Sequence, residues 1–300
     1  MPLKKLIVPV IFSLMVMFSG CGKHEKGGSS RIQVVCGLPP VAFIASQVGG
    51  DKVEVRSMLP EGRSPHDYAP RPADIRHAGT AKFFFTTGMN FENSAVKSLP
   101  DRVNIADVSK NIKRRHFDDG HGCCDGHGHD HHHHGEAALD PHVWLSPDNA
   151  ASIAGVILES LRAADPVNGE YYQANYERFK GELEKVSADM KQRLAPYAGR
   201  EFLVYHPAFG YFADAVGLRQ HPLEINGREM TAVQLANVIA KAKKENIKVV
   251  FVQKQFNPGT AGELARRISG ETLPLDPLAF DLLKNFKAMT DAICKGLGGK

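Results

Sequence analysis

The 300-residue sequence has little net charge, because 37 basic and 33 acidic side chains leave a formal charge of +4 at pH 7. Two of the positive charges, Lys4 and Lys5, lie in a segment that we expect to be removed. The sequence also has no arginine-rich stripe and no basic patch interleaved with aromatic residues, which are the usual marks of nucleic-acid binding. We therefore expect no nucleic-acid partner.

Common catalytic motifs are missing as well. The sequence contains no His-Glu-x-x-His helix, no nucleophile elbow and no phosphate-binding loop. We therefore predict that the protein is not an enzyme, and we assign no catalytic residue.

No hydrophobic run is long enough to serve as a permanent membrane-spanning helix. The apolar run near the N-terminus covers only Leu6 to Phe18, whereas a spanning helix needs about 20 residues. Basic residues precede this run and the small residues Ser19 and Gly20 follow it, so residues 1–20 are typical of an export signal.

The end of this signal, Phe-Ser-Gly-Cys, resembles the cleavage box of bacterial lipoproteins, in which the cysteine carries the lipid. We therefore expect a lipid anchor at Cys21, with cleavage to a soluble exported protein as the alternative. Residues 21–30 are polar and contain glycine and serine, as a flexible tether does. The predicted location is the cell envelope or periplasm.

Runs of strand-forming residues alternate with helical stretches on both sides of a long helical segment. This alternation favours parallel sheets with helices on both faces. We predict an α/β fold of two lobes, residues 31–164 and 197–300, each with a mainly parallel sheet. The expected strands are 31–36, 53–59, 81–86 and 103–106 in the first lobe, and 200–206, 247–252 and 273–275 in the second.

Residues 165–196 are predicted to form one long helix that links the lobes. Asp165 and Pro166 form a helix-start signal, and Pro196 ends the helix. An ordinary surface helix is the alternative, but the similar patterns on its two sides favour a link. The expected apolar stripe consists of Val167, Tyr171, Ala174, Phe179, Leu183, Val186, Met190 and Leu194.

A histidine-rich segment, residues 116–134, precedes the linking helix and has no apolar periodicity. It is predicted to be an irregular surface loop. Imidazoles and thiols bind zinc, copper and nickel, so we expect an auxiliary site of weak metal binding, with a solvated polar loop as the alternative. Its histidines are His116, His121, His127, His129, His131, His132, His133 and His134, beside the pair Cys123 and Cys124.

Four other residues lie where predicted strands meet loops: His66, His142, His206 and Asp276. Two come from each side of the linking helix. Ligands of parallel sheets bind outside the carboxyl ends of the strands. Three imidazoles and one carboxylate can complete a tetrahedral zinc shell, whereas manganese prefers more oxygen ligands.

Here the chain resembles the metal-binding lipoproteins of ABC importers, specifically their zinc branch. The resemblance covers residues 31–300. It rests on Ser-Pro-His-Asp-Tyr, on Asp-Pro-His-Val-Trp-Leu-Ser-Pro with the histidine-rich segment before it, on Tyr-His-Pro-Ala-Phe-Gly-Tyr-Phe, and on the last Asp-Pro-Leu. Manganese-binding relatives differ, because they carry a glutamate where this chain has His206.

The resemblance implies that His66, His142, His206 and Asp276 bind the metal, and that two lobes are joined by one rigid helix. It further implies a monomer that binds Zn²⁺ as cargo and delivers it to a membrane permease with its ATPase. A manganese- or iron-binding homologue, a metal-dependent adhesin or a storage lipoprotein are the alternatives. A zinc hydrolase remains if Asp276 points elsewhere and a water takes its place.

Two further cysteines, Cys36 and Cys294, lie in predicted regular structure. A disulfide between them is possible after export. The sequence supplies no geometry to decide this, so both the paired and the free states stay open.

Overall fold

The computed structural model describes residues 31–117, 139–225, 228–256 and 259–298. Residues from Arg31 onward form one compact unit. The predicted export signal, the tether with Cys21, and most of the histidine-rich segment lie outside the described residues. Within the described ranges, no helix is both long enough and apolar enough to cross a membrane.

The first lobe is built on a sheet of four parallel strands in the order β2-β1-β3-β4. The central strands β1 and β3 are rich in β-branched and aromatic residues, and Val34, Phe84 and Phe85 are buried in the core. The strands are β1 (Ile32–Cys36), β2 (Val53–Ser57), β3 (Phe83–Thr86) and β4 (Asn104–Asp107), and the helices are α1 (Pro39–Gly49), η1 (Gly50–Lys52), α2 (Pro72–Ala78) and α3 (Asn90–Val96).

The second lobe repeats this plan. Its sheet is also parallel, in the order β10-β9-β5-β6, which is the first lobe's order when each lobe's strands are counted along the chain. The strands are β5 (Glu201–Val204), β6 (Arg219–Pro222), β9 (Val249–Val252) and β10 (Glu271–Pro274), and the helices are α6 (Gly210–Val216), α7 (Ala232–Lys244), α8 (Gly259–Arg267) and α9 (Leu282–Gly296). The predicted α/β fold of two parallel sheets is therefore confirmed.

Some predicted boundaries were wrong. The strand expected over residues 53–59 ends at Ser57, and the strand expected over 200–206 covers only Glu201–Val204. The last helix begins at Leu282 because the Asp281 side chain accepts a hydrogen bond from the Lys284 amide. A short antiparallel pair, β7 (Glu224–Ile225) and β8 (Arg228–Glu229), was not predicted.

The long linking helix is confirmed, but its start differs from the prediction. A single 3₁₀ turn, η3 (Pro166–Asn168), precedes α5 (Gly169–Leu194), and η4 (Ala195–Tyr197) follows it. The Asp165 carboxylate accepts hydrogen bonds from the Asn168 side chain and the Tyr172 hydroxyl and caps no backbone amide.

The first half of the predicted stripe was also wrong. Val167 is 94% exposed, Ala174 is exposed, and Tyr172 is buried in place of Tyr171. From Phe179 to Leu194 the predicted apolar positions are buried. Val167 lies in the 3₁₀ turn, but Tyr171 and Ala174 lie inside α5. Two turns of an α-helix take about seven residues, so Tyr172 shares the face of Phe179, whereas Tyr171 and Ala174 do not.

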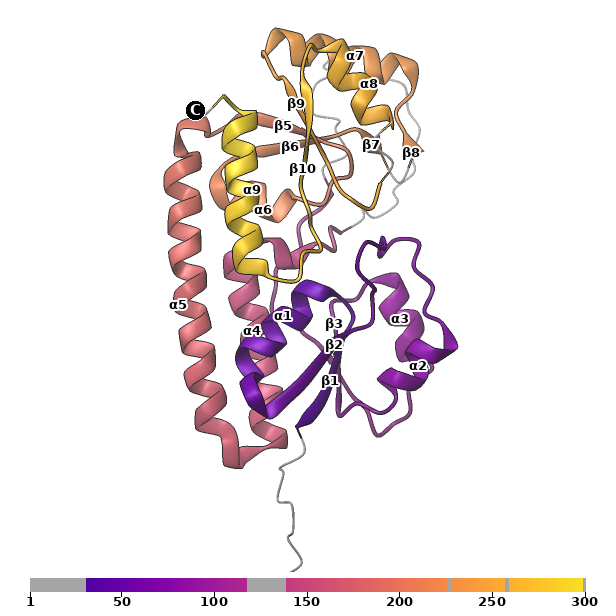
Figure 1. Ribbon diagram of the computed structural model, residues 1–300, viewed down its shortest axis with the longest axis vertical. Helices are drawn as coiled ribbons and strands as arrows, with labels where there is room; N and C mark the ends of the chain where they lie inside the picture. The colour runs from indigo at the N-terminus through magenta and orange to yellow at the C-terminus, as the bar shows by residue number, and fades with distance from the viewer. Residues whose placement is uncertain (1–30, 118–138, 226–227, 257–258, 299–300) are drawn as a thin grey trace, which may run out of the picture. The chain divides into compact units, whose positions relative to one another are not determined.

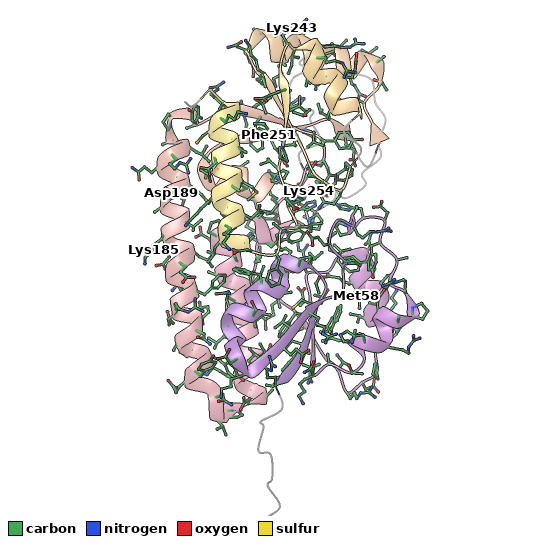
Figure 2. The ribbon with its side chains drawn as sticks, viewed as in Figure 1. Met58, Lys185, Asp189, Lys243, Phe251 and Lys254 are labelled. Atoms are coloured by element: carbon green, nitrogen blue, oxygen red, sulfur yellow. The ribbon has the colours of Figure 1, made fainter. Side chains whose placement is uncertain are left out.

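Helix α5 packs against α1 and α4 (Pro147–Ala164) on the side of the first lobe, and against α6 and α9 of the second (Figure 1). Figure 2 shows Lys185 and Asp189 projecting outward from α5, away from these helices. Helix α4 was not predicted, although Ser146 caps it and Pro147 is its first residue. Because α5 contacts helices of both lobes, it can hold the two lobes in a fixed relative position.

The thiols of Cys36 and Cys294 are both free. Cys36 is buried beside β3, and burial raises the pKa of its thiol well above the ordinary value. No disulfide joins the two lobes through these residues.

Candidate metal site

Three of the four predicted ligands come together between the two sheets. His66 lies in the loop after β2, His142 immediately precedes η2 (Val143–Leu145), and His206 follows β5. One ring nitrogen from each lies within 4.8 Å of the others. The ring centroids are 4.6 Å apart for His66 and His206, and 5.5 and 5.3 Å from each of these to His142.

The three imidazoles are shielded to different degrees. His142 and His206 are 2% and 7% exposed, whereas His66 is exposed. Burial of its ring, together with the neighbouring His142 and His206, nevertheless lowers the pKa of His66 to about 3. Solvent on the exposed side of His66 screens part of this effect. Burial also lowers the pKa of His206, so both rings are uncharged at neutral pH, the form that binds metal.

Asp140 orients His142. The Nδ1 atom of His142 lies 2.8 Å from Asp140 Oδ1, and the same oxygen accepts a hydrogen bond from the His142 backbone amide at 2.9 Å. Because Asp140 is completely buried, this pairing favours the tautomer with the proton on Nδ1, which leaves the Nε2 lone pair for a metal.

His206 is held by the second lobe. Its backbone amide donates to Gln253 Oε1 at 3.2 Å, and Gln253 Nε2 donates to its carbonyl at 2.6 Å. Its ring stacks on Phe256 with the centroids 5.1 Å apart. Glu224 Oε2 lies 3.4 Å from His206 Nδ1, an ion-pair distance without hydrogen-bond geometry.

The Nε2 atom of His206 is buried and makes no hydrogen bond with another described residue, whereas Nδ1 has the Glu224 carboxylate beside it. A buried polar atom without a partner is costly in free energy. A metal ion bound to Nε2 removes that cost. The ring therefore fits a metal ligand better than it fits a residue of the core.

Asp276 follows β10 but is not part of the group of three. Its Oδ1 accepts hydrogen bonds from the Leu278 amide at 3.0 Å and from Gln255 Nε2 at 3.3 Å, and Lys254 Nζ lies 3.5 Å from Oδ2. Asp276 lines a cavity of about 430 Å³ that shares Gln255 and Leu278 with the small pocket at the three histidines. The buried Trp144 donates to the Pro277 carbonyl at 2.7 Å and so ties this loop to the first lobe.

The first two residues of the histidine-rich segment, and Leu139 beyond its end, lie beside the same site. His116 forms an isolated antiparallel bridge with Leu139, and the Phe117 ring contacts the His142 ring edge-on at 6.1 Å. The remaining histidines of the segment, with Cys123 and Cys124, lie outside the described residues.

Residues that sequence reasoning missed support the ligands from behind. They are Glu224, Gln253 and Phe256 around His206, and Arg115 behind Asp140. None of them belongs to a local motif with the ligand that it supports. Only Arg115 could have been singled out from the sequence, because it directly precedes the histidine-rich segment.

Known proteins share both the sequence and the fold. A family model described as "zinc-uptake complex component A periplasmic" (ZnuA) matches residues 34–296. The high-affinity zinc uptake system protein ZnuA of Bacillus subtilis is 30% identical over 282 residues, covering 90% of this chain and 87% of the relative. The manganese ABC transporter substrate-binding lipoprotein PsaA of Streptococcus mitis is 27% identical over 254 residues, covering 83% of this chain and 81% of the relative.

A crystal structure of ZnuA superposes on this chain with a TM-score of 0.81 at 29% identity, covering 89% of this chain and all of the other. Members of this family are metal-binding components of transporters and not enzymes. The match of the family model across nearly the whole described chain, with the shared fold, leads to one conclusion: the chain belongs to the ZnuA family of substrate-binding proteins of ABC metal transporters.

Proposed function

We propose that the protein binds Zn²⁺ outside the cytoplasm through His66, His142, His206 and Asp276, and delivers it to an ABC permease for uptake. The observation that carries the proposal is the group of three imidazoles with donor nitrogens within 4.8 Å of one another. Two of these rings have lowered pKa values and are ready to bind without first losing a proton.

Zinc is favoured over manganese by the donor set. Zinc takes four nitrogen, sulfur or oxygen ligands in a tetrahedral shell, whereas Mn²⁺ suits carboxylate, carbonyl and water oxygens. The names of the relatives do not decide between the two metals, because one relative is named for zinc uptake and another for manganese. The choice for this chain therefore rests on its own three imidazoles.

Asp276 is proposed as the fourth ligand, in agreement with its position after β10 at the mouth of the site. Both hydrogen bonds from Gln255 and the Leu278 amide go to Oδ1, so Oδ2, which lies 3.5 Å from Lys254 Nζ, is the oxygen left to bind the metal. Four protein ligands leave no open position for a substrate water, which separates this site from that of a zinc hydrolase.

Export and membrane attachment complete the proposal. Residues 1–20 direct export, Cys21 carries the lipid, and residues 21–30 act as the tether. The partners are a membrane permease and its ATPase, as expected for a substrate-binding protein of this family. The histidine-rich segment acts as an auxiliary, weaker collector of metal.

Growth tests this function better than affinity does, because nearly every nitrogen and oxygen site binds Zn²⁺ more tightly than Mn²⁺. A strain that lacks the gene grows poorly in chelator-treated medium, and added zinc restores growth at concentrations where manganese does not. Complementation with the wild-type gene restores growth in limiting zinc, and complementation with His142→Ala does not. Rescue by manganese alone would assign the site to that metal, and normal growth of the deletion strain would contradict a role in import.

A further inference from the structure

Arg115 lies at the root of the histidine-rich segment, directly behind the proposed ligand His142. Its Nη1 atom is 3.3 Å from Asp140 Oδ2, while the other oxygen of the same carboxylate holds the ring of His142. Its carbonyl also accepts a hydrogen bond from the Asp140 amide at 2.9 Å. Side chain and backbone of Arg115 thus both hold Asp140.

This contact matters because Asp140 has no access to solvent. A buried carboxylate needs charge compensation as well as hydrogen bonds, and removing one partner of such a pair leaves an uncompensated charge. Arg115 supplies the positive charge at one oxygen, and His142 is bonded to the other. The orientation of the His142 ring therefore depends on Arg115 through Asp140.

Arg115 also connects this arrangement to α6 of the second lobe. Its Nε donates to Asp214 Oδ2 at 2.9 Å, and its backbone amide donates to the Tyr211 hydroxyl at 3.1 Å. That hydroxyl in turn donates to the Asp140 carbonyl at 3.1 Å. The guanidinium lies 6.0 Å from the centre of the Tyr211 ring.

Gly210, the first residue of α6, provides the space for the guanidinium. A Cβ atom at this position would lie 1.7 Å from Arg115 Nη1 and 2.9 Å from Asp140 Oδ2. Any residue other than glycine would therefore push the guanidinium away from the Asp140 carboxylate. The close approach at Gly210 ties the second lobe to the residues behind His142.

We propose that Arg115 is a positioning residue for zinc: through Asp140 it fixes the ring of His142, and through Asp214 and Tyr211 it makes that orientation depend on the second lobe. This inference rests on the proposed function, since it concerns the same zinc site. Metal affinity and the packing of α6 against the first lobe are thereby coupled through a residue that does not touch the metal.

The neighbouring Arg114 provides a matched control. Its Nη2 atom donates to the Thr87 carbonyl and to the Ser109 hydroxyl, each at 2.6 Å, within the first lobe. It has the same charge and the same place beside the histidine-rich segment, but its bonds lead away from His142. A general loss of charge or of local stability should therefore affect both arginines alike.

The experiment compares Arg115→Gln, Gly210→Ala and Arg114→Gln in the full-length protein, with zinc affinity measured by chelator competition. Removing a group that orients a ligand typically weakens metal binding by about 10- to 100-fold. We expect that loss for Arg115→Gln and Gly210→Ala and a change below about threefold for Arg114→Gln. Arg115→Lys should recover part of the affinity, because a lysine supplies charge without the guanidinium fork.

A second readout needs no metal. The ¹⁵N shifts of the His142 ring report which nitrogen carries the proton, and Arg115→Gln and Gly210→Ala should both reduce the population protonated at Nδ1. Unfolding in urea shows whether the variants are folded. Equal zinc affinity and an unchanged ring tautomer in folded Arg115→Gln would overturn the inference, whereas a wild-type protein without a tight zinc site would refute the proposed function itself.

Discussion

Replacing His206 by alanine should separate metal binding from folding. If the complete site binds zinc with a Kd near 1 nM, its binding free energy is about −12 kcal/mol. Shared among four ligands, this gives about 3 kcal/mol for each, so His206→Ala should weaken zinc binding roughly 150-fold. The same change in the metal-free protein removes no hydrogen bond from the ring nitrogens.

What the metal-free protein loses is the contact of the ring with Phe256 and the pairing of Nδ1 with Glu224. Stacked aromatic pairs contribute about 0.5–1.5 kcal/mol, and the buried Nε2 atom that lacks a hydrogen bond disappears with the ring. We therefore expect the free energy of unfolding without zinc to fall by only about 1 kcal/mol. The expected loss of zinc-binding free energy, about 3 kcal/mol, is therefore about three times as large as the expected loss of stability.

Trp144 and His221 allow the loss of zinc affinity to be measured separately from the loss of stability. Trp144 is the single tryptophan of the sequence, is fully buried, and its ring centroid lies 5.5 Å from that of His142. Its fluorescence therefore reports zinc at the three histidines and not metal elsewhere. His221 of the same lobe is a matched control, because it pairs with Glu201 at 3.5 Å and lies outside the group of three.

The assay is a zinc titration against a chelator of known affinity, followed by Trp144 fluorescence, together with urea unfolding of each metal-free variant. His221→Ala should lose stability without losing zinc affinity. A loss of zinc affinity below tenfold in His206→Ala, or an equal loss in His221→Ala, would refute the reasoning.

Three further predictions concern the loop, pH and temperature. Deleting residues 119–134, which leaves Phe117 and the pairing of His116 with Leu139 in place, should keep one tight zinc and remove weaker binding in a calorimetric titration. The segment must be ordered around each captured metal, at about 1–2 kcal/mol per residue, so loss of the tight zinc would show that the loop supplies ligands. Because the pKa values of His66 and His206 are lowered in the folded protein, metal-free stability in urea should fall as pH drops below the unfolded imidazole pKa of about 6.5. Because protons compete with zinc for the same ring nitrogens, zinc should be released only below that pH. A metal-free stability that does not change with pH would contradict the burial of these rings. Free zinc at about 1,000 times Kd should add about 4 kcal/mol to the unfolding free energy, and an unchanged melting temperature would argue against binding at the folded site.

The sequence predicted the parts of the fold that repeat. Strand-forming runs such as Phe83 to Phe85 are buried in the centre of their sheet, and they alternate with helical stretches in both halves of the chain. The same pattern placed His66 and His206 in loops that follow strands, as found after β2 and β5, whereas His142 directly precedes η2 and follows no strand closely. Parallel sheets bring such positions together regardless of their separation in sequence.

What the sequence did not reveal depends on details of phase and packing. Val167 lies in the 3₁₀ turn before α5 and is exposed, and the expected stripe departed from the helical period before Phe179, so Tyr172 is buried in place of Tyr171. Helix α4 did carry a start signal at Ser146 and Pro147 that was overlooked. Glu224 lies in a two-residue strand, and no local pattern connects it with His206. Contacts of this kind are formed only when the chain has folded.

The role of Glu224 follows from the same comparison. It faces His206 from the second lobe as Asp140 faces His142 from the first, although at 3.4 Å the contact is longer. Glu224→Gln should therefore weaken zinc binding by less than Asp140→Asn, with both values taken from the fluorescence titration. The reverse order would show that the His206 ring depends on its carboxylate more than the distances indicate.

The most direct test of zinc binding at this site is X-ray absorption at the zinc K-edge of protein loaded with one equivalent of zinc. The account predicts four nitrogen or oxygen ligands at about 2.0–2.2 Å, with the outer-shell scattering of three imidazoles and no sulfur. His206→Ala should reduce that imidazole contribution. A sulfur ligand at about 2.3 Å, or a six-coordinate shell of oxygen atoms, would contradict a zinc site made of His66, His142, His206 and Asp276.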